Sequence, residues 1–178
     1  MWGRARAAAA QALARDAEVF ERIGYRRGEA AGPLAVRLEP PAGRPVLIAR
    51  LAQQGRIFGG AYALELSTEA PALPPTRGLS ARGRGIVRLT RVDFRPRRGD
   101  GAGEALARRL EGDTALQRTL AAVHFDRIRV EPDGRAVVRH MGGSVVWVLF
   151  PPVVRPVPFT AEQAHATAKA LEAFAGAT

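Results

Sequence analysis

The chain of 178 residues contains no cysteine, and this absence excludes several kinds of chemistry at once. Disulfide bonds, cysteine-ligated zinc sites and thiol nucleophiles all require that side chain. No run of apolar residues approaches the roughly 20 that a helix needs to cross a bilayer. Residues 1–10 are too short and too weakly apolar for a secretory signal. We therefore expect a cytoplasmic protein without a membrane span.

The motifs of the common enzyme classes are also missing. The sequence has no G-x-S-x-G nucleophile elbow, no H-E-x-x-H zinc motif, no P-loop and no dinucleotide fingerprint. Residues 99–103 are rich in glycine and precede an expected helix, but they lack the lysine and the hydroxyl residue of a P-loop. The sequence thus predicts neither a cofactor nor a metal ion, and it favours a non-catalytic protein.

Lysine is nearly absent, since Lys169 is the single one, yet the chain carries 27 basic and 17 acidic residues and a formal net charge of +10. A charge of this size attracts anionic partners at long range. The abundance of arginine, alanine, glycine and proline is also what GC-rich coding produces. Binding chemistry and codon usage therefore remain two explanations for the arginine excess.

The residues that are present predict alternating helices and strands. Apolar side chains recur at helical spacing in four segments, which we predict as helices: residues 3–23, 104–111, 114–121 and 160–175. Thr160 and Gln163 form a capping box at the start of the last helix. Strand patterns occupy residues 34–39, 46–52, 57–66 and 86–94. Residues 67–85 are rich in proline, glycine and arginine without a hydrophobic period, which predicts a long exposed connection.

Residues 123–150 are predicted as a three-stranded antiparallel meander with a turn at residues 131–134 and a second turn at Gly142-Gly143. Counting outward from the first turn pairs Val130 with Ala136, Ile128 with Val138 and Asp126 with His140. Counting outward from the second turn pairs His140 with Val145, Val138 with Trp147 and Ala136 with Leu149. One face of the first hairpin carries Arg127, Arg129 and Arg139. The last strand is apolar on both faces, so we expect it inside a larger sheet.

Two stretches of the chain resemble each other. Residues 36–40 (VRLEP) match residues 128–132 (IRVEP), and residues 12–15 (ALAR) match residues 105–108. We interpret the chain as a single α+β domain, residues 1–178, with an antiparallel sheet built from two helix-plus-three-strand halves at about residues 3–66 and 102–150. The expected order is α-βββ-β-α-βββ-α, with an internal duplication as one explanation.

The predicted register suggests one candidate catalytic site. It places Asp126 opposite His140, with His124 on the same strand, and a carboxylate beside an imidazole can orient a general base. The alternative is a polar pair that closes the solvated end of the sheet.

A second candidate site is a basic region in the middle of the chain. It contains seven arginines: Arg82, Arg84, Arg88, Arg91, Arg95, Arg97 and Arg98. Such a region binds phosphates or a nucleic-acid backbone, or it is an ordinary solvated surface. Phe94 is its one aromatic residue, so the stacking pattern typical of base recognition is missing.

The stretch from His140 to Ser144 (HMGGS), the proline-containing arm with Arg155 and the final helix with Gln163 resemble a family of bacterial proteins. That family, mostly from proteobacteria, is a domain of unknown function, and the resemblance covers the last third to half of the chain. It implies a bacterial cytoplasmic protein and no particular activity. We interpret the chain as a non-catalytic binding or interaction domain whose partner is a second copy, an anionic ligand or a nucleic acid. An enzyme that uses the His/Asp set remains the other alternative.

Overall fold

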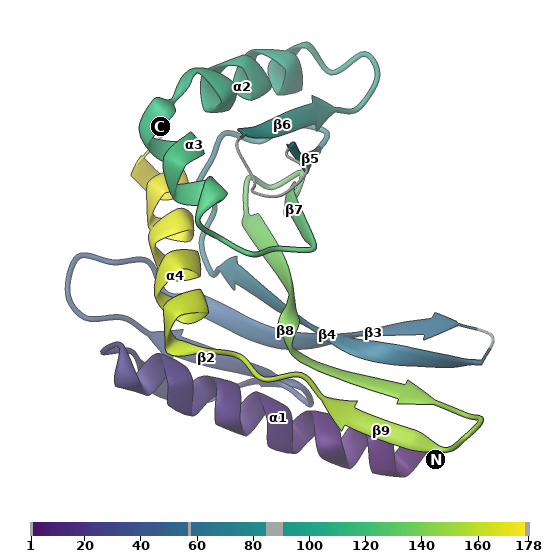
Figure 1. The fold of residues 1–178 in the computed structure, drawn as a ribbon. Coiled ribbons are helices and arrows are strands. Elements are labelled where there is room, and N and C mark those ends of the chain that lie inside the picture. Colours follow the sequence, from purple (N-terminus) through teal and green to yellow (C-terminus); the bar gives the residue numbers. More distant parts are fainter. Residues whose placement is uncertain (1, 57, 85–90, 177–178) are drawn as a thin grey trace.

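The computed structural model describes residues 2–56, 58–84 and 91–176, which form helices and antiparallel strands (Figure 1). The helices are α1 (Trp2–Arg22), α2 (Gly101–Gly112), α3 (Thr114–Ala121) and α4 (Ala161–Gly176). The first six strands are β1 (Arg26–Gly32), β2 (Ala35–Glu39), β3 (Leu47–Arg56), β4 (Gly59–Thr68), β5 (Leu79–Arg84) and β6 (Arg91–Pro96). The last three are β7 (Arg127–Val130), β8 (Ala136–Val148) and β9 (Val153–Pro156). The fold is therefore α+β, as predicted.

All nine described strands belong to one antiparallel sheet in the order β1-β2-β3-β4-β8-β7-β5-β6, with β9 paired to β8. Strand β8 joins the two parts of the chain. One of its edges pairs with β4 over nearly its whole length, and its other edge pairs first with β7 and then with β9. The helices pack on one face of this sheet and leave the other face uncovered (Figure 1).

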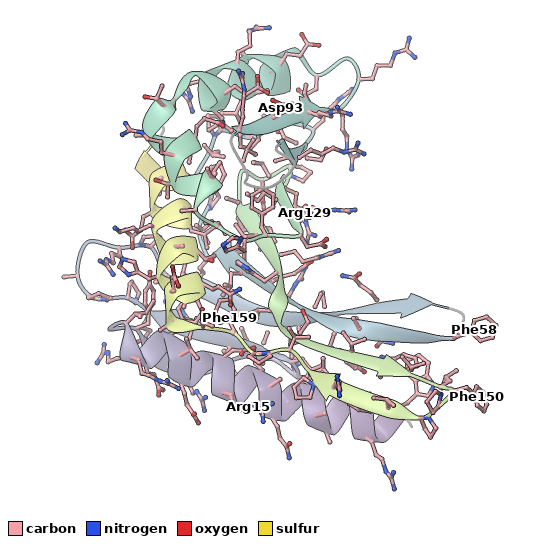
Figure 2. All side chains as sticks on the ribbon, in the orientation of Figure 1. Arg15, Phe58, Asp93, Arg129, Phe150 and Phe159 are labelled. Carbon is pink, nitrogen blue, oxygen red and sulfur yellow. The ribbon has the colours of Figure 1, made fainter. Side chains whose placement is uncertain are left out.

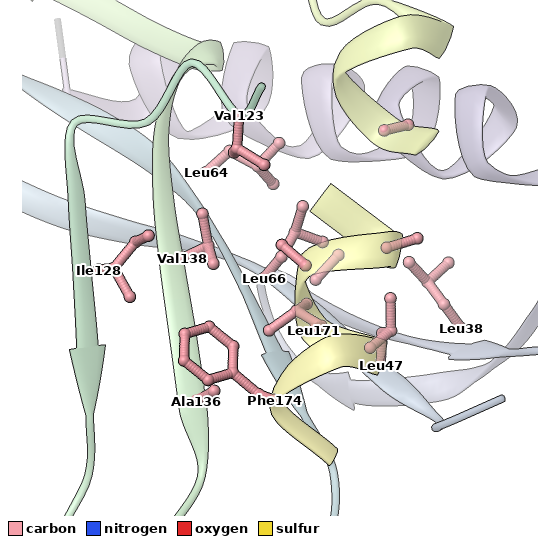
Figure 3. Close-up of a cluster of buried hydrophobic side chains, with 14 of the residues drawn as sticks. Leu38, Leu47, Leu64, Leu66, Val123, Ile128, Ala136, Val138, Leu171 and Phe174 are labelled. Atoms are coloured by element: carbon pink, nitrogen blue, oxygen red, sulfur yellow. The ribbon is translucent and has the colours of Figure 1, made fainter. Parts of the chain in front are cut away.

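The hydrophobic core lies between that face and the helices. Every second residue of a strand points toward the helices, and α4 contributes Leu171 and Phe174 from its buried side (Figure 3). Leu38, Leu64 and Val138 come from three different strands and are all fully buried. Because inward and outward residues alternate along each strand, the same pattern that builds the core fixes which side chains reach the uncovered face.

Several local predictions are confirmed. Val130 pairs with Ala136 and Ile128 pairs with Val138. The backbone N–H of Thr160 donates to Oε1 of Gln163 at 3.0 Å, and the N–H of Gln163 donates to Oγ1 of Thr160 at 3.2 Å. This reciprocal capping box starts α4 at the predicted place.

The predicted turn at Gly142-Gly143 is wrong. Strand β8 continues through it, because Leu64 pairs with His140 and Tyr62 pairs with Val145, so residues 141–144 bulge opposite one residue of β4. Gly143 has a φ of +76°, and a Cβ there would collide with side-chain atoms of Leu64 and Asp16. The glycines thus serve a bulge and a close helix contact. The pairs His140–Val145, Val138–Trp147 and Ala136–Leu149 do not form, although β4 and β9 do flank the apolar strand as expected.

The connection predicted at residues 67–85 is more ordered than expected. It contains β5, and Ala72 and Leu73 are buried with their N–H groups donating to the carbonyl oxygen of Gly134. Strand β1 was not predicted either, since its sequence RRGEAAG has no apolar alternation. Of the strand predicted at residues 86–94, residues 86–90 lie outside the described part of the chain. Six of the described strands precede α2, where four were expected, so the proposed order of repeated halves is not confirmed.

Candidate functional site

The uncovered face of the sheet is rich in arginine. Strand pairing brings Arg50 on β3, Glu65 on β4 and Arg139 on β8 into one row across three neighbouring strands. Arg127 on β7 continues this row beside Arg139. A second row runs from Arg129 on β7 through Ser80 on β5 to Arg95 on β6. We call this surface the arginine face.

Three guanidinium groups converge on the carboxylate of Glu65 at the centre of the arginine face. Nη2 of Arg139 lies 2.6 Å from Oε1, and Nη2 of Arg50 lies 2.7 Å from Oε2. Arg129 is bidentate, with bonds of 3.0 and 3.1 Å to the two oxygens. Glu65 itself is only 1% exposed. Each oxygen therefore accepts charge-assisted hydrogen bonds from two or more arginine nitrogens.

The ionisation of Glu65 follows from two opposed effects. Burial by itself would raise the pKa of this carboxyl group, but the hydrogen bonds from Arg129, Arg139 and Arg50 outweigh burial and lower the pKa to about 2. Arg129 also donates to Glu131 at 2.5 Å. Three positive side chains therefore share two carboxylates, so the cluster keeps a positive charge that it can offer to an anion.

The structure brings part of the predicted basic region next to this cluster. Arg82 on β5 and Arg95 on β6 are exposed on the arginine face, and Arg95 pairs with Ser80 beside Arg129. Arg91 on β6 contacts Asp93 at 3.4 Å and Glu111 at 3.5 Å. Arg97 and Arg98 are exposed in the loop before α2. The side chain of Arg84 and all of Arg88 lie outside the described part of the chain.

The predicted His/Asp set is not brought together. His140 is fully buried, where its Nδ1 lies 3.1 Å from the carbonyl oxygen of His124 and its Nε2 lies 2.9 Å from Oγ1 of Thr167 on α4. Burial lowers the pKa of His140 to about 4, although the hydrogen bond to His124 opposes this shift. A carbonyl oxygen only accepts, so Nδ1 carries the proton, and the unprotonated Nε2 shares the single hydroxyl proton of Thr167 with the carbonyl oxygen of Gln163, which lies 2.7 Å from the same Oγ1. His140 therefore links strand β8 to α4 through its contact with Thr167.

The other two members of the set lie apart from that ring. The side chains of Asp126 and His124 are exposed, and His124 reaches His140 through its backbone oxygen. The backbone N–H of Asp126 donates to the carbonyl oxygen of Arg139. Within the described ranges, no group of three His, Cys, Asp or Glu side chains is placed to hold a metal ion.

Comparison with known families identifies the chain at the level of its family. Residues 6–178 match the family model described as "Protein of unknown function (DUF3156)". The chain belongs to this family. The match confirms the resemblance to a domain-of-unknown-function family and extends it from the carboxyl-terminal part to nearly the whole DUF3156 chain. No curated protein and no solved structure matches the chain.

An apolar groove of about 790 Å³ adjoins the arginine face of the DUF3156 protein. Small side chains on the uncovered side of β4 and β8 line it, namely Ala61, Ala63 and Val146. Ala63 is two residues from Glu65 on the same strand face, so the groove begins where the arginine cluster ends. None of the described helices is both long and apolar enough to span a membrane.

Sequence reasoning missed the centre of this site. The first hairpin correctly placed Arg129 and Arg139 on one face, but nothing local identified Glu65 or Arg50 as their partners. Those contacts depend on the pairing of β4 with β8, which joins segments far apart in sequence. A single acidic residue in the apolar stretch of β4, YALEL, was the available signal, because a buried carboxylate requires a cationic partner.

Proposed function

We propose that this DUF3156 protein is a non-catalytic binding domain that holds an anionic partner against its arginine face. The observation that supports the proposal is the convergence of Arg50, Arg129 and Arg139 on the buried carboxylate of Glu65. A sheet face without covering helices is accessible to a partner, and guanidinium groups bind phosphate and carboxylate groups through paired hydrogen bonds.

The charge of the arginine face supports an anionic partner. Among the side chains that the structure describes, seven arginines point outward from β3 and β5 to β8, against three carboxylates that belong to Glu65, Asp93 and Glu131. The arginines are Arg50, Arg82, Arg91, Arg95, Arg127, Arg129 and Arg139. Because Glu65 already fixes three of the guanidinium groups, an anion that binds beside them meets side chains that have lost much of their rotational freedom. Such preorganisation favours binding.

Binding of a nucleic acid or another polyanion through Arg82 to Arg98 is the second candidate function. The position of Arg82 and Arg95 beside the central cluster favours it, because the two regions then form one continuous basic surface. Phe94, the aromatic residue of the region, is 4% exposed and points into the core, so it offers no stacking surface to a base. This candidate function therefore uses phosphate contacts without base recognition.

A binding titration tests the proposal. Fluorescence anisotropy of a labelled oligothymidylate and a labelled polyglutamate would be measured at two salt concentrations. We expect salt-sensitive binding of at least one probe, and about tenfold weaker binding by an Arg82→Ser/Arg95→Ser variant, with a smaller salt dependence. These two side chains are exposed and leave the Glu65 cluster intact.

The matched control is Arg15→Ser/Arg22→Ser. It removes the same charge from the exposed side of α1, away from the arginine face (Figure 2). Its binding should stay within about threefold of the parent protein, which is the change expected when only the net charge is reduced. Equal loss in the two variants, or no salt-sensitive binding to either probe, would contradict the proposal.

A further inference from the structure

The large apolar side chains that are exposed in the described residues gather at one end of the molecule. They are Trp2 (54% exposed), Phe58 (72%), Val148 (37%), Phe150 (83%) and Val153 (40%). Isolated exposed apolar residues are ordinary, but a contiguous group marks a surface that contacts something other than water. We call this group the apolar tip.

Three segments that are distant in sequence build the apolar tip. The N–H of Leu149 donates to the carbonyl oxygen of Phe58 at 3.1 Å, which joins the end of the β3–β4 hairpin to the end of the β8–β9 hairpin. Val148 pairs with Val153 inside the second hairpin. The ring of Trp2 lies 4.6 Å from the ring of Trp147, so the start of α1 reaches the same place. Phe58 and Phe150 project from neighbouring hairpin ends (Figure 2).

The segments around the apolar tip lack acidic residues. None of the 17 acidic residues occurs in residues 1–15, 40–64 or 140–161, although these segments contain several arginines. Arg4, Arg6 and Arg155 are exposed. The first turn of α1 has no acidic residue either, so the positive end of the helix dipole is uncompensated at this end. The segments that form the apolar tip therefore carry a net positive charge, and Asp126 is the acidic residue that lines the groove beside Phe58.

We propose that the apolar tip docks on the surface of an anionic lipid bilayer. Aromatic side chains favour the boundary between headgroups and acyl chains, and arginines beside them attract anionic headgroups. A second copy of the chain would bring the same arginines to the contact and would be repelled. Phe58 and Val148 also line the apolar groove that adjoins the arginine face, but each proposal is tested at residues that the other does not use, so the two proposals can fail independently.

Vesicle binding followed by tryptophan fluorescence tests the proposal. The chain has two tryptophans, Trp2 and Trp147, and their rings are in contact at the apolar tip. We expect a blue shift and co-sedimentation with phosphatidylcholine vesicles that contain about 30% phosphatidylglycerol, and weaker binding without the anionic lipid or at high salt.

Substitutions at the two phenylalanines supply the decisive comparison. Phe58→Ser/Phe150→Ser should lower the vesicle partition coefficient at least about tenfold, because two large apolar groups no longer leave water. Phe58→Leu/Phe150→Leu keeps apolar side chains and should stay within about threefold. Both side chains are largely exposed, so the thermal stability of the variants should match that of the parent protein.

Two further measurements separate this proposal from binding at the arginine face. The Phe58→Ser/Phe150→Ser variant should still bind the polyanion probe, and the Arg82→Ser/Arg95→Ser variant should still bind vesicles. The bilayer proposal is overturned by a lack of vesicle binding at both lipid compositions, or by equal binding of the serine and parent proteins. It is also overturned if the serine substitutions abolish self-association of a protein that does not bind vesicles.

Discussion

Arg139 on β8 and Glu65 on β4 face each other across neighbouring strands, and two hydrogen bonds of 2.6 and 3.0 Å join their side chains. Arg50 and Arg129 approach the same carboxylate from β3 and β7. One ionised group thus connects four adjacent strands on the uncovered face. The hydrophobic core stabilises one face of the sheet, and this polar cluster stabilises the other face.

Replacement of Glu65 by alanine should destabilise the protein strongly. The change leaves the partly buried guanidinium groups of Arg129 and Arg139, and the exposed one of Arg50, without their shared counterion, and loss of a buried counterion typically costs about 3–5 kcal/mol. Urea unfolding at pH 7 measures the loss. Glu69→Ala is the control, because the Glu69 side chain is 43% exposed and solvent screens its pair with Arg37, so its loss should change stability little. Similar losses for the two variants would contradict a central role of Glu65.

Stability should fall in acid because of two depressed pKa values. The pKa of Glu65 is about 2 when folded, against a usual value of 4.5, so its stabilisation is present above pH 4.5 and is lost as the pH falls toward 2. The pKa of His140 is about 4 when folded, against a usual value of 6.5, so the stabilisation from its neutral ring is lost as the pH falls from 6.5 to 4. For Glu65 the difference corresponds to about 3 kcal/mol. Urea midpoints at pH 7, 5 and 3 test this expectation, and the Glu65→Gln variant should lose the more acidic step.

Thr167→Val should destabilise the junction between α4 and the sheet. The substitution keeps the shape of the side chain but removes the hydroxyl that lies 2.9 Å from Nε2 of His140. A buried ring nitrogen without a partner costs about 1–3 kcal/mol. Thr167→Ser retains the hydroxyl and should lose about 1 kcal/mol or less from the missing methyl group. If the valine variant unfolds at the same urea concentration as the parent, the hydrogen bond does not support the fold.

Asp16→Asn should stabilise the protein at high pH. Asp16 is buried on α1 at 5% exposure, and its Oδ2 has no hydrogen-bond partner among the described residues. Burial raises its pKa from 3.8 to about 7, although the nearby charge of Arg15 opposes the shift. The stabilisation from the protonated form is therefore fully present below pH 3.8 and is lost as the pH rises through 7. Asparagine stays neutral, so the variant should gain about 1–3 kcal/mol at pH 8.5, a smaller amount at pH 5 and little below pH 3.8.

The outcome at pH 8.5 is decisive for Asp16. A variant that is less stable than the parent at that pH would show that the ionised carboxylate has a favourable partner. Gly143 lies directly against this carboxyl group, and a Cβ at Gly143 would come within 2.7 Å of Oδ2. The bulge of β8 and the burial of Asp16 are therefore parts of one close contact between helix and sheet.

The sequence predicted the elements whose determinants are local. The helices follow from apolar spacing, and the first hairpin follows from the turn chemistry of residues 131–134. Gly142 and Gly143 misled the prediction because a positive φ suits a tight turn and a bulge equally well. Only the partner strand decides between them, and β4 lies in the other half of the chain. Strand β1 escaped prediction because it is an exposed edge strand without an apolar face.

The candidate site was predictable to a similar degree. The basic region that contains Arg82 and Arg95 is visible in the sequence, and alternation placed Arg129 and Arg139 on one face. Their meeting at Glu65 was not predictable, because the contact requires four strands to assemble in the correct order. The position of His140 likewise depends on the packing of α4, which no local pattern specifies.

The pairing of β4 with β8 has a consequence for synthesis on the ribosome. Strand β4 ends at Thr68, and its partner begins only at Ala136, so residues 69–135 must be added before the pair can form. At about 5–20 residues per second this takes on the order of 3 to 13 seconds. During that time the nascent chain carries an unpaired strand edge with Leu64 and Leu66 exposed, which is a template for aggregation. The β4 edge therefore stays open to pairing with other chains until β8 has been made.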